Sequence, residues 1–299
     1  MKGLDSKKKS RLIFYICGVA WPVIQFIVFY VFVNFNSILL SFRNFDIQSG
    51  YSFARLDNFK RVFSEIATQP FLKTSFKNTF LIFGISIVSM FATLIMSYYL
   101  YKKHLFSGIF KVMLFLPSII PGIALVICYK YFVEVGVPKI WEEVFNISIQ
   151  GLLSNPDTKL ITILFFNVWF GVGSTFLLYS GAMSGISDSI IEAATLDGVT
   201  AMQEFGYIVF PMIFPTFATF FITSFATLFT NQMSVFSFSG AQADYSVYTI
   251  GYYLYKSVQT ATMDQYPYLS AFGLVLTVII IPICLLTKKA LDKFGPKTI

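Results

Sequence analysis

The chain has 299 residues, of which 56% are hydrophobic and only 12% are Asp, Glu, Lys or Arg. Soluble domains have about 25% charged residues, and a single soluble core cannot bury this much apolar surface. The composition therefore excludes an ordinary soluble domain and predicts a protein that lies in a lipid bilayer. We interpret the net charge of +7 as flanking charge on membrane helices, and we expect no nucleic-acid partner.

Six apolar stretches are long enough to cross a bilayer, since a transmembrane helix needs about 20 residues. They cover residues 12–33, 79–101, 111–133, 160–183, 206–235 and 267–287. The first is too long for the apolar part of a signal peptide, so we expect it to be retained. The sequence thus predicts an all-α integral membrane protein with about six transmembrane helices. The expected parts are a basic N-terminal segment (1–11), a membrane domain (12–287) and a tail (288–299).

Basic residues gather at both ends of the chain. Those before the first span are Lys2, Lys7, Lys8, Lys9 and Arg11, and those after the last are Lys288, Lys289, Lys293 and Lys297. Cytoplasmic flanks of membrane helices are enriched in Lys and Arg, and six spans put both termini on one side. We therefore predict a multi-pass protein of the cytoplasmic membrane with both termini in the cytoplasm. The segment 34–78 would lie outside despite its own basic residues.

The connection between the fourth and fifth spans, about 184–205, has an unusual charge. No Lys or Arg occurs between Lys159 and Lys256. The connection instead carries four acidic residues, namely Asp188, Glu192, Asp197 and Glu204. A cytoplasmic loop with acidic residues and no basic ones departs from the usual charge bias. A cationic surface on a partner protein would account for it.

The same connection contains two local signals for helix starts. Ser189 and Glu192 have the spacing of a capping box, and so do Thr200 and Gln203. Gly198 lies where the first helix is expected to stop. We therefore expect a short helix, a glycine turn and a second helix that runs towards Pro211. The acid at Glu192 could serve only as a cap, or it could cap the helix and also contact a partner.

The sequence of this loop, over about residues 187–211, resembles the EAA loop of binding-protein-dependent ABC importer permeases. The matching residues are Ser189, Glu192, Ala193, Ala194, Asp197, Gly198, Ile208 and Pro211. Phe210 stands where that family usually has Leu. The resemblance implies a cytoplasmic coupling helix between helices four and five, which docks on a separate ATPase subunit.

Further segments resemble the carbohydrate-type members of this family, in the maltose and glycerol-phosphate permease branch. They include Leu56-Asp57-Asn58-Phe59, Asn78-Thr79, Phe115-Leu116-Pro117, Pro121-Gly122 and Thr249-Ile250. The segment Ser239-Gly240-Ala241 departs from the family pattern. The resemblance implies transport of an oligosaccharide or sugar derivative delivered by an extracellular solute-binding protein. The implied partners are a second homologous permease and two ABC ATPase subunits that bind ATP-Mg.

The sequence contains no motif that would bind ATP, couple transport to an ion or catalyse a reaction. It has no phosphate-binding loop of the G-x-x-x-x-G-K-[ST] type, and we find no carboxylate near the middle of a span. The charged pair Lys130 and Glu134 is expected to extend towards the interface from the third span. The three cysteines lack metal-site spacing, so we expect no metal. Without a catalytic motif, we also expect no cofactor in this chain and no enzymatic activity. The alternative is a self-sufficient secondary carrier or channel for a small neutral solute.

Polar side chains on the apolar spans are candidates for the lining of a substrate pathway, since they are unfavourable against lipid. Thr216, Thr219, Thr223, Thr227 and Thr230 share one helical stripe in the fifth span. The candidates for the pathway are Asn167, Thr223, Thr227, Asn231 and Gln232. Such residues also serve to satisfy backbone carbonyls or to join helices, and this alternative stays open for each Thr.

Overall fold

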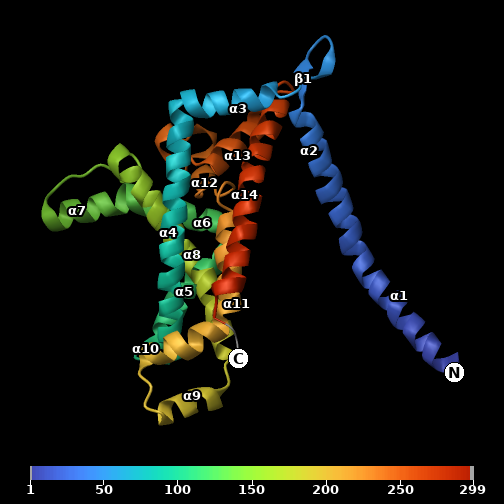
Figure 1. Ribbon diagram of the computed structural model, residues 1–299. Helices are drawn as coiled ribbons and strands as arrows, with labels where there is room; N and C mark the ends of the chain where they lie inside the picture. Colours follow the sequence, from blue (N-terminus) through green and yellow to red (C-terminus); the bar gives the residue numbers. More distant parts are fainter. Residues whose placement is uncertain (1, 297–299) are drawn as a thin grey trace. The chain divides into compact units, whose positions relative to one another are not determined.

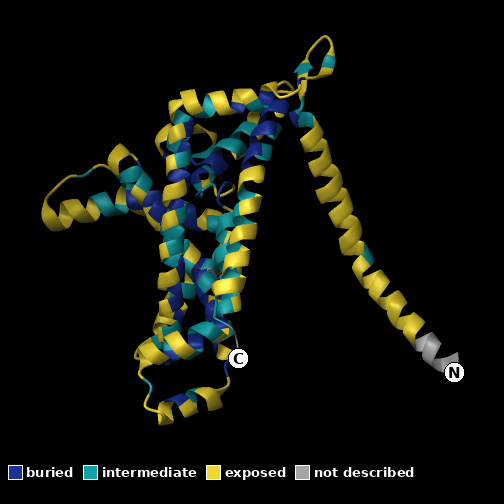
Figure 2. Cartoon of the chain, viewed as in Figure 1, coloured by how far each residue is buried: buried dark blue, intermediate teal, exposed yellow. Residues whose placement is uncertain are grey.

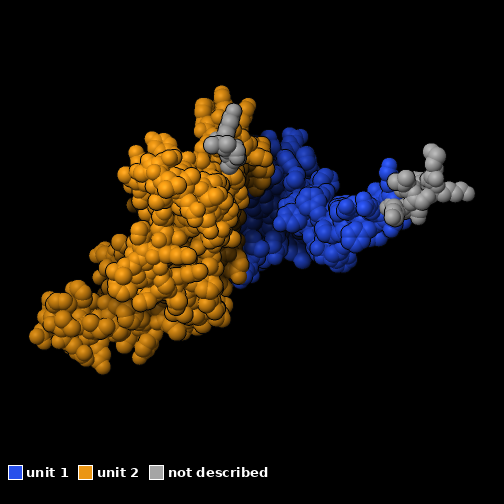
Figure 3. All heavy atoms as spheres, turned by 90° about the horizontal axis from the view of Figure 1, so that it is seen from below, with its two compact units in different colours: residues 1–66, 257–276 blue, residues 67–256, 277–299 orange. Residues whose placement is uncertain are grey.

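The computed structural model describes residues 2–296. Residue 1 and residues 297–299, at the outer ends of the predicted N-terminal segment and tail, lie outside the described residues, and Lys297 is among them. The chain divides into two compact units (Figure 3). One comprises Met1–Ile66 with Ser257–Leu276, and the other comprises Ala67–Lys256 with Thr277–Ile299.

The described residues are mainly helical (Figure 1). Five of their helices are long and apolar enough to cross a membrane, and a bent pair brings the number to six if it counts as one span. The five are Lys8–Ser41, Pro70–Tyr101, Pro156–Ser184, Ala201–Ala226 and Tyr266–Phe294. This confirms the prediction of an all-α membrane protein with about six spans.

The first unit begins with one long helical run, formed by α1 (Lys2–Gln25), a π-helical segment (Phe26–Phe32) and α2 (Val33–Ser41). It continues eight residues beyond the predicted end of the first span at residue 33. Its large apolar side chains are exposed from Leu12 to Leu39 (Figure 2). Exposed Phe, Ile and Val side chains on this scale are stable only against lipid or another apolar partner.

A hairpin and a short helix follow in the same unit. Strands β1 (Arg43–Asp46) and β2 (Gly50–Phe53) pair antiparallel, with Arg43 opposite Phe53. The backbone N–H groups of Ser49 and Gln48 donate to the Asp46 carboxylate and lower the pKa of that group. Helix α3 (Asp57–Thr68) follows, and Asn58 joins it to the preceding chain. The Asn58 Nδ2 donates to the carbonyls of Ser41 and Arg43 at 3.0 and 2.8 Å.

Helices α4 (Pro70–Tyr101) and α8 (Pro156–Ser184) form the centre of the second unit. Helix α5 (Ser107–Ile119) packs on α8 at Gly173. A Cβ atom at Gly173 would lie 2.5 Å from the Leu114 carbonyl oxygen, so only glycine allows this approach. Helix α11 (Phe210–Ala226) also contacts α8 and α4.

The third predicted span, 111–133, is bent in the structure. Helix α5 ends at Ile119, and the chain turns by 105° before α6 (Gly122–Tyr131), a π-helical segment (Phe132–Gly136) and α7 (Val137–Phe145). The cause is Pro121, which lacks a backbone N–H and forces the preceding Ile120 into an extended conformation. The 13 residues of α5 cover about 20 Å, which is short of the ~30 Å hydrocarbon thickness.

The fifth predicted span, 206–235, starts earlier and ends earlier in the structure. Helix α10 (Ala201–Glu204), a π-helical segment (Phe205–Val209) and α11 run on continuously and stop at Ala226. Residues 227–234 form turns, in which Met233 and Ser234 have positive φ angles. Helix α12 (Val235–Ser239) follows. The Asn231 Oδ1 accepts from the Met233 N–H at 2.8 Å, a side-chain turn that competes with helix.

The charged pair of the third span forms hydrogen bonds within the second unit. The Lys130 Nζ donates to the Phe238 carbonyl at 3.1 Å. The Glu134 carboxylate accepts from the Leu153 N–H at 2.6 Å and from the Ser154 hydroxyl at 2.7 Å. Both side chains therefore hold neighbouring segments of the second unit, because carbonyl and N–H groups near lipid need partners.

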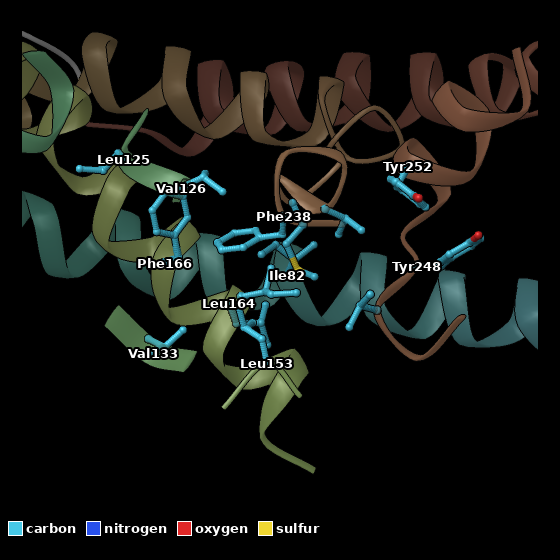
Figure 4. Packing of buried hydrophobic residues seen from close by; sticks show 14 residues of the cluster. Ile82, Leu125, Val126, Val133, Leu153, Leu164, Phe166, Phe238, Tyr248 and Tyr252 are labelled. Carbon is cyan, nitrogen blue, oxygen red and sulfur yellow. The ribbon is translucent and has the colours of Figure 1, made fainter. Parts of the chain in front are cut away.

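Two buried clusters hold the second unit together. The first joins α4, α6, α8 and α12 through residues such as Ile82, Val126, Phe166 and Phe238 (Figure 4). The second joins α4, α8 and α11; it comprises Met90, Leu94, Tyr179, Met183, Ile186, Val209, Ile213 and Phe217.

Two of the segments that resemble carbohydrate permeases, Asn78-Thr79 and Thr249-Ile250, meet in one place. The Asn78 Nδ2 donates to the carbonyls of Ser246 and Tyr248, at 2.8 and 2.9 Å. The Thr79 hydroxyl accepts from the Ile250 N–H at 2.9 Å, where α13 (Ile250–Thr260) begins. These bonds tie the start of α13 to α4.

The substitution Gly251→Ala is expected to destabilise this junction. A Cβ at Gly251 would lie 2.6 Å from both the Asn231 carbonyl oxygen and the Thr230 carbonyl carbon, which are backbone atoms. Backbone displacement of this kind costs about 1–3 kcal/mol. We expect a lower thermal unfolding midpoint in detergent. Gly84→Ala on α4 is the matched control, since nothing lies within 4 Å of its Cβ position. Equal midpoints for the two variants would contradict the packing.

Candidate functional site

A cavity of about 400 Å³ lies within the second unit, between α4, α8 and α11. Its wall includes Ile82 from the first buried cluster and Met90 from the second. The cavity therefore lies at the level where one apolar core ends and the other begins. The polar lining side chains are Ser86, Ser89, Thr93, Asn167, Thr175, Thr223, Ser224, Thr227 and Asn231. None of the lining residues, all of which the structure describes, is ionisable.

Most of these hydroxyls already donate their proton within their own helix. Ser86 donates to the Ile82 carbonyl, Thr93 to Ser89 and Thr223 to Thr219, at 2.7–2.8 Å. Thr175, Ser224 and Thr227 do the same. A hydroxyl that donates in this way keeps its oxygen lone pairs as acceptors. The wall is therefore rich in hydrogen-bond acceptors and suits a ligand that brings many O–H donors.

The structure brings four of the five predicted pathway residues to this wall. Asn167, Thr223, Thr227 and Asn231 line the cavity, and Gln232 does not. The other threonines of the predicted stripe, which are Thr216, Thr219 and Thr230, also lie outside the lining. Helix α11 ends at Ala226. Beyond this point helical spacing no longer determines which way a side chain such as that of Thr230 points.

Asn167 has a structural role at this wall. Its Nδ2 donates to the Ile163 carbonyl at 2.8 Å and to the Met233 carbonyl at 2.9 Å. Its Oδ1 accepts from the Ser234 hydroxyl at 3.1 Å. The amide thus holds the turn after α11 against α8. Joining segments in this way is the alternative to a pathway role for a polar residue in a span.

The sequence analysis missed the α4 side of the cavity. Ser86, Ser89 and Thr93 line it from that helix. They recur at intervals of three and four residues, so they share one face of α4. This spacing is visible in the sequence and would have allowed Ser86, Ser89 and Thr93 to be predicted.

The short helix predicted between the fourth and fifth spans is α9 (Asp188–Leu196). Its N-cap is Ser187 rather than Ser189, and Ser189 lies in the first turn. The predicted capping box of Ser189 and Glu192 was therefore wrong, and no side-chain cap bond is formed. The Ser187 and Ser189 hydroxyls bond each other at 2.8 Å, and Glu192 is left exposed.

The glycine stop is confirmed. Gly198 has a φ of +71°, the left-handed region that favours glycine. Its N–H donates to the Thr195 carbonyl, and the Val199 N–H donates to the Ala194 carbonyl, both at 3.1 Å. These two bonds form a Schellman motif, which satisfies carbonyls at the end of α9 and turns the chain.

The second capping box is confirmed as well. The Gln203 N–H donates to the Thr200 hydroxyl, and the Gln203 Oε1 accepts from the Thr200 N–H at 3.0 Å. The helix that begins here continues through Ile208 and Pro211, both half-buried, into α11. The connection is therefore built as two helices joined by one glycine turn.

A buried ion pair holds the second helix to α4. Glu204 is 4% exposed, and both of its carboxylate oxygens accept from the Lys102 Nζ, at 3.0 and 2.9 Å. The Tyr98 hydroxyl lies 3.2 Å from the same carboxylate and 2.9 Å from the Ala201 carbonyl. The sequence analysis counted Glu204 only among the acids offered to a partner. Its pairing depends on a residue about one hundred positions away, which no local pattern indicates.

The α9 projection combines acidic and apolar exposed residues. Glu192, Ala193 and Asp197 are exposed, whereas Ala194 is buried. Leu196 and Met202 are 90% and 79% exposed. An exposed apolar patch edged by charge is typical of a protein–protein contact.

A comparison with protein families matches residues 84–299 to the family described as "Binding-protein-dependent transport system inner membrane component". This range covers most of the chain and includes the α9 connection and every cavity-lining residue except Ile82. The chain belongs to this family. It is therefore a multi-pass inner-membrane component of a transport system, and its part in that system is non-catalytic.

Curated relatives of this transport family cover nearly the whole chain. The multiple sugar-binding transport system permease protein MsmF of Streptococcus mutans is 23% identical over 91% of this chain and 93% of its own length. The probable ABC transporter permease protein YesP of Bacillus subtilis is 29% identical over 93% and 92%.

Solved structures show the same fold. A chain of a bacterial alginate ABC transporter, crystallised with an alginate pentasaccharide-bound periplasmic protein, superposes with a TM-score of 0.75 at 17% identity. The match covers 98% of this chain and 99% of that chain. The inner-membrane transport component thus has the fold of an ABC transporter chain over its full length.

Proposed function

We propose that this inner-membrane component is a permease subunit of an ATP-driven ABC importer for a neutral carbohydrate, an oligosaccharide or sugar derivative. One observation carries the cargo assignment: the cavity wall offers hydroxyl and amide groups, and no ionisable side chain of the described residues lines it. Sugars bring many O–H donors, which match oxygen acceptors that already donate within their own helices. The volume of the cavity, about 400 Å³, is within the range of small-molecule sites.

The names of the relatives support a carbohydrate. One is a sugar-binding transport system permease, and the matched crystal structure belongs to an alginate transporter. Alginate is described there as an acidic polysaccharide. The cavity of the present chain has no cationic side chain among its lining residues, all of them described, which favours an uncharged sugar instead.

We propose that α9 is the coupling helix and docks on one of two ABC ATPase subunits, which bind ATP-Mg. The support is its rigid construction from a Schellman motif and a capping box, together with its exposed acidic and apolar residues. In this proposal α9 and both termini lie in the cytoplasm. The further partners are a second homologous permease and an extracellular solute-binding protein.

The double substitution Thr223→Val and Thr227→Val is expected to reduce sugar uptake. Valine keeps the shape of threonine and removes the acceptor oxygen from the cavity wall. A hydrogen bond of this kind is worth about 1 kcal/mol, or about fivefold. We therefore expect roughly 25-fold weaker uptake of labelled sugar by cells that express the whole transporter, with normal amounts of protein in the membrane.

Thr219→Val is the matched control for this experiment. The Thr219 hydroxyl donates to the Pro215 carbonyl in the same helix at 2.8 Å but does not line the cavity. Uptake by this variant should equal that of the wild type. If Thr219→Val impaired uptake as much as the double variant, the threonines would act on helix packing, and the cavity would not be the sugar path.

A further inference from the structure

A second pocket, of about 520 Å³, lies in the second unit where α4 ends and α5 begins, and residues of α9 also line it. Figure 1 shows the three helices. Three lysines line it, namely Lys102, Lys103 and Lys111. The hydroxyl of Ser107 and the carboxylate of Asp188 also belong to its wall. The pocket is separate from the cavity described above, with which it shares no lining residue.

The charges of this pocket leave a surplus of one cation. Lys102 is already paired with Glu204. Lys103 and Lys111 then face a single lining acid, Asp188. This surplus matches one phosphodiester, which carries one negative charge. A lysine ammonium is a suitable phosphate partner because it carries a full charge and three donors.

The turn that carries Lys103 is held in an unusual conformation. Lys103 and Phe106 both have positive φ angles, of 51° and 62°, although neither is glycine. The Tyr99 hydroxyl donates to the Leu105 carbonyl at 2.8 Å and holds the turn. Leu105 and Phe106 are exposed beside the cations. An exposed apolar pair flanked by lysines suits a bilayer surface.

An apolar groove of about 220 Å³ adjoins this pocket. Its lining residues are Met96, Tyr99, Leu100, Phe110 and Leu114, from α4 and α5. Leu100 lines both the groove and the lysine pocket. A cationic pocket and an apolar groove therefore meet at one side chain, as the head group and acyl chain of a phospholipid require.

We propose that this composite site binds one anionic phospholipid, with its phosphodiester between Lys103 and Lys111 and an acyl chain in the groove along α4 and α5. Basic pockets between membrane helices on the cytoplasmic side suit such head groups. Because Asp188 begins α9, the lipid would touch the helix of the cytoplasmic connection. The proposal does not depend on the identity of the transported solute.

Native mass spectrometry of the purified wild-type chain tests the site without any substitution. The chain would be offered equal amounts of phosphatidylglycerol and phosphatidylcholine of the same acyl length. We expect one phosphatidylglycerol to be retained at a collision energy that removes phosphatidylcholine. Equal retention of the two lipids would overturn the proposal.

A pair of double variants locates the site. Each cytoplasmic lysine near a head group contributes about fivefold to binding, so Lys103→Gln with Lys111→Gln should weaken retention of phosphatidylglycerol about 25-fold. Lys288→Gln with Lys289→Gln removes the same charge from α14 (Tyr266–Phe294), outside the pocket, and should leave retention unchanged. Equal losses in both would show a general effect of charge and reject the site.

Inorganic phosphate distinguishes a lipid from a free anion. The thermal midpoint of the chain in phosphatidylcholine nanodiscs would be measured with added phosphate and, separately, with phosphatidylglycerol in the bilayer. We expect stabilisation by phosphatidylglycerol alone, and its loss when Leu114→Gln interrupts the groove. Stabilisation by free phosphate to the same extent would contradict the lipid assignment.

Discussion

Gly198→Val is expected to abolish ATP-driven uptake by the whole transporter while the chain still inserts into the membrane. A non-glycine residue in the left-handed region costs about 1–2 kcal/mol, and a β-branched side chain fits it worst. The Schellman motif would open, and α9 would lose its fixed direction relative to α10. We expect at least tenfold lower uptake and a weaker stimulation of ATP hydrolysis by the loaded binding protein.

Gly198→Asn separates conformation from size. Nothing lies within 4 Å of a Cβ at this position, so a larger side chain meets no clash. Asparagine adopts the left-handed conformation more readily than other non-glycine residues. Uptake by Gly198→Asn should therefore stay within a few-fold of the wild type. Equal loss in both variants would mean that the side chain itself blocks a contact, and the turn geometry would not be the cause.

Lys102→Met is expected to have the largest effect on stability. It leaves the Glu204 carboxylate, whose side chain is 5% exposed, without its cation. Breaking a buried pair from one side costs about 3 kcal/mol or more. We expect a lower unfolding midpoint in detergent and increased proteolysis near α10, because this pair holds the second helix of the connection to α4.

The double variant Lys102→Met and Glu204→Gln tests whether the pair itself is responsible. With the acid neutralised, the uncompensated buried charge disappears, so most of the lost stability should return. Lys103→Met is the matched control, since Lys103 lies beside Lys102 and forms no ion pair among the described residues. A double variant as unstable as Lys102→Met would show that the methionine fails for a reason other than charge.

Local signals in the sequence predicted those parts of the fold that depend on neighbouring residues. The capping box at Thr200 and the stop at Gly198 are of this kind, because their bonds join residues three to five positions apart. Helix α8 also follows its apolar run closely at both ends, and α14 does so at its start. Hydropathy alone reports such runs well, since lipid requires continuous apolar surface.

Features that depend on competing local geometries were harder to predict. The run at 111–133 is mainly apolar, yet Pro121 breaks it, because hydropathy does not register a missing N–H. The start of α9 was placed two residues late, since Ser187 and Ser189 are both suitable caps. The end of α11 depends on the side-chain turn at Asn231, which no apolar count reveals.

The candidate site was predicted in part. Asn167, Thr223, Thr227 and Asn231 reached the cavity wall, because polar residues in spans tend to avoid lipid. The α4 wall was missed, and so was the pairing of Lys102 with Glu204. These features arise from the packing of α4 against helices more than seventy positions later in the chain. A single sequence contains no direct record of such contacts.

Uptake by proteoliposomes tests whether this chain carries sugar only together with ATPase subunits and ATP. Vesicles would contain this chain and its companion permease, with or without the ATPase subunits, and a labelled neutral oligosaccharide would be supplied with the binding protein outside. The account predicts sugar accumulation only when the ATPases and internal ATP are both present, and no accumulation with Gly198→Val. Equilibration of sugar by the chain alone, without ATPases or ATP, would contradict the account and favour a self-sufficient carrier or channel.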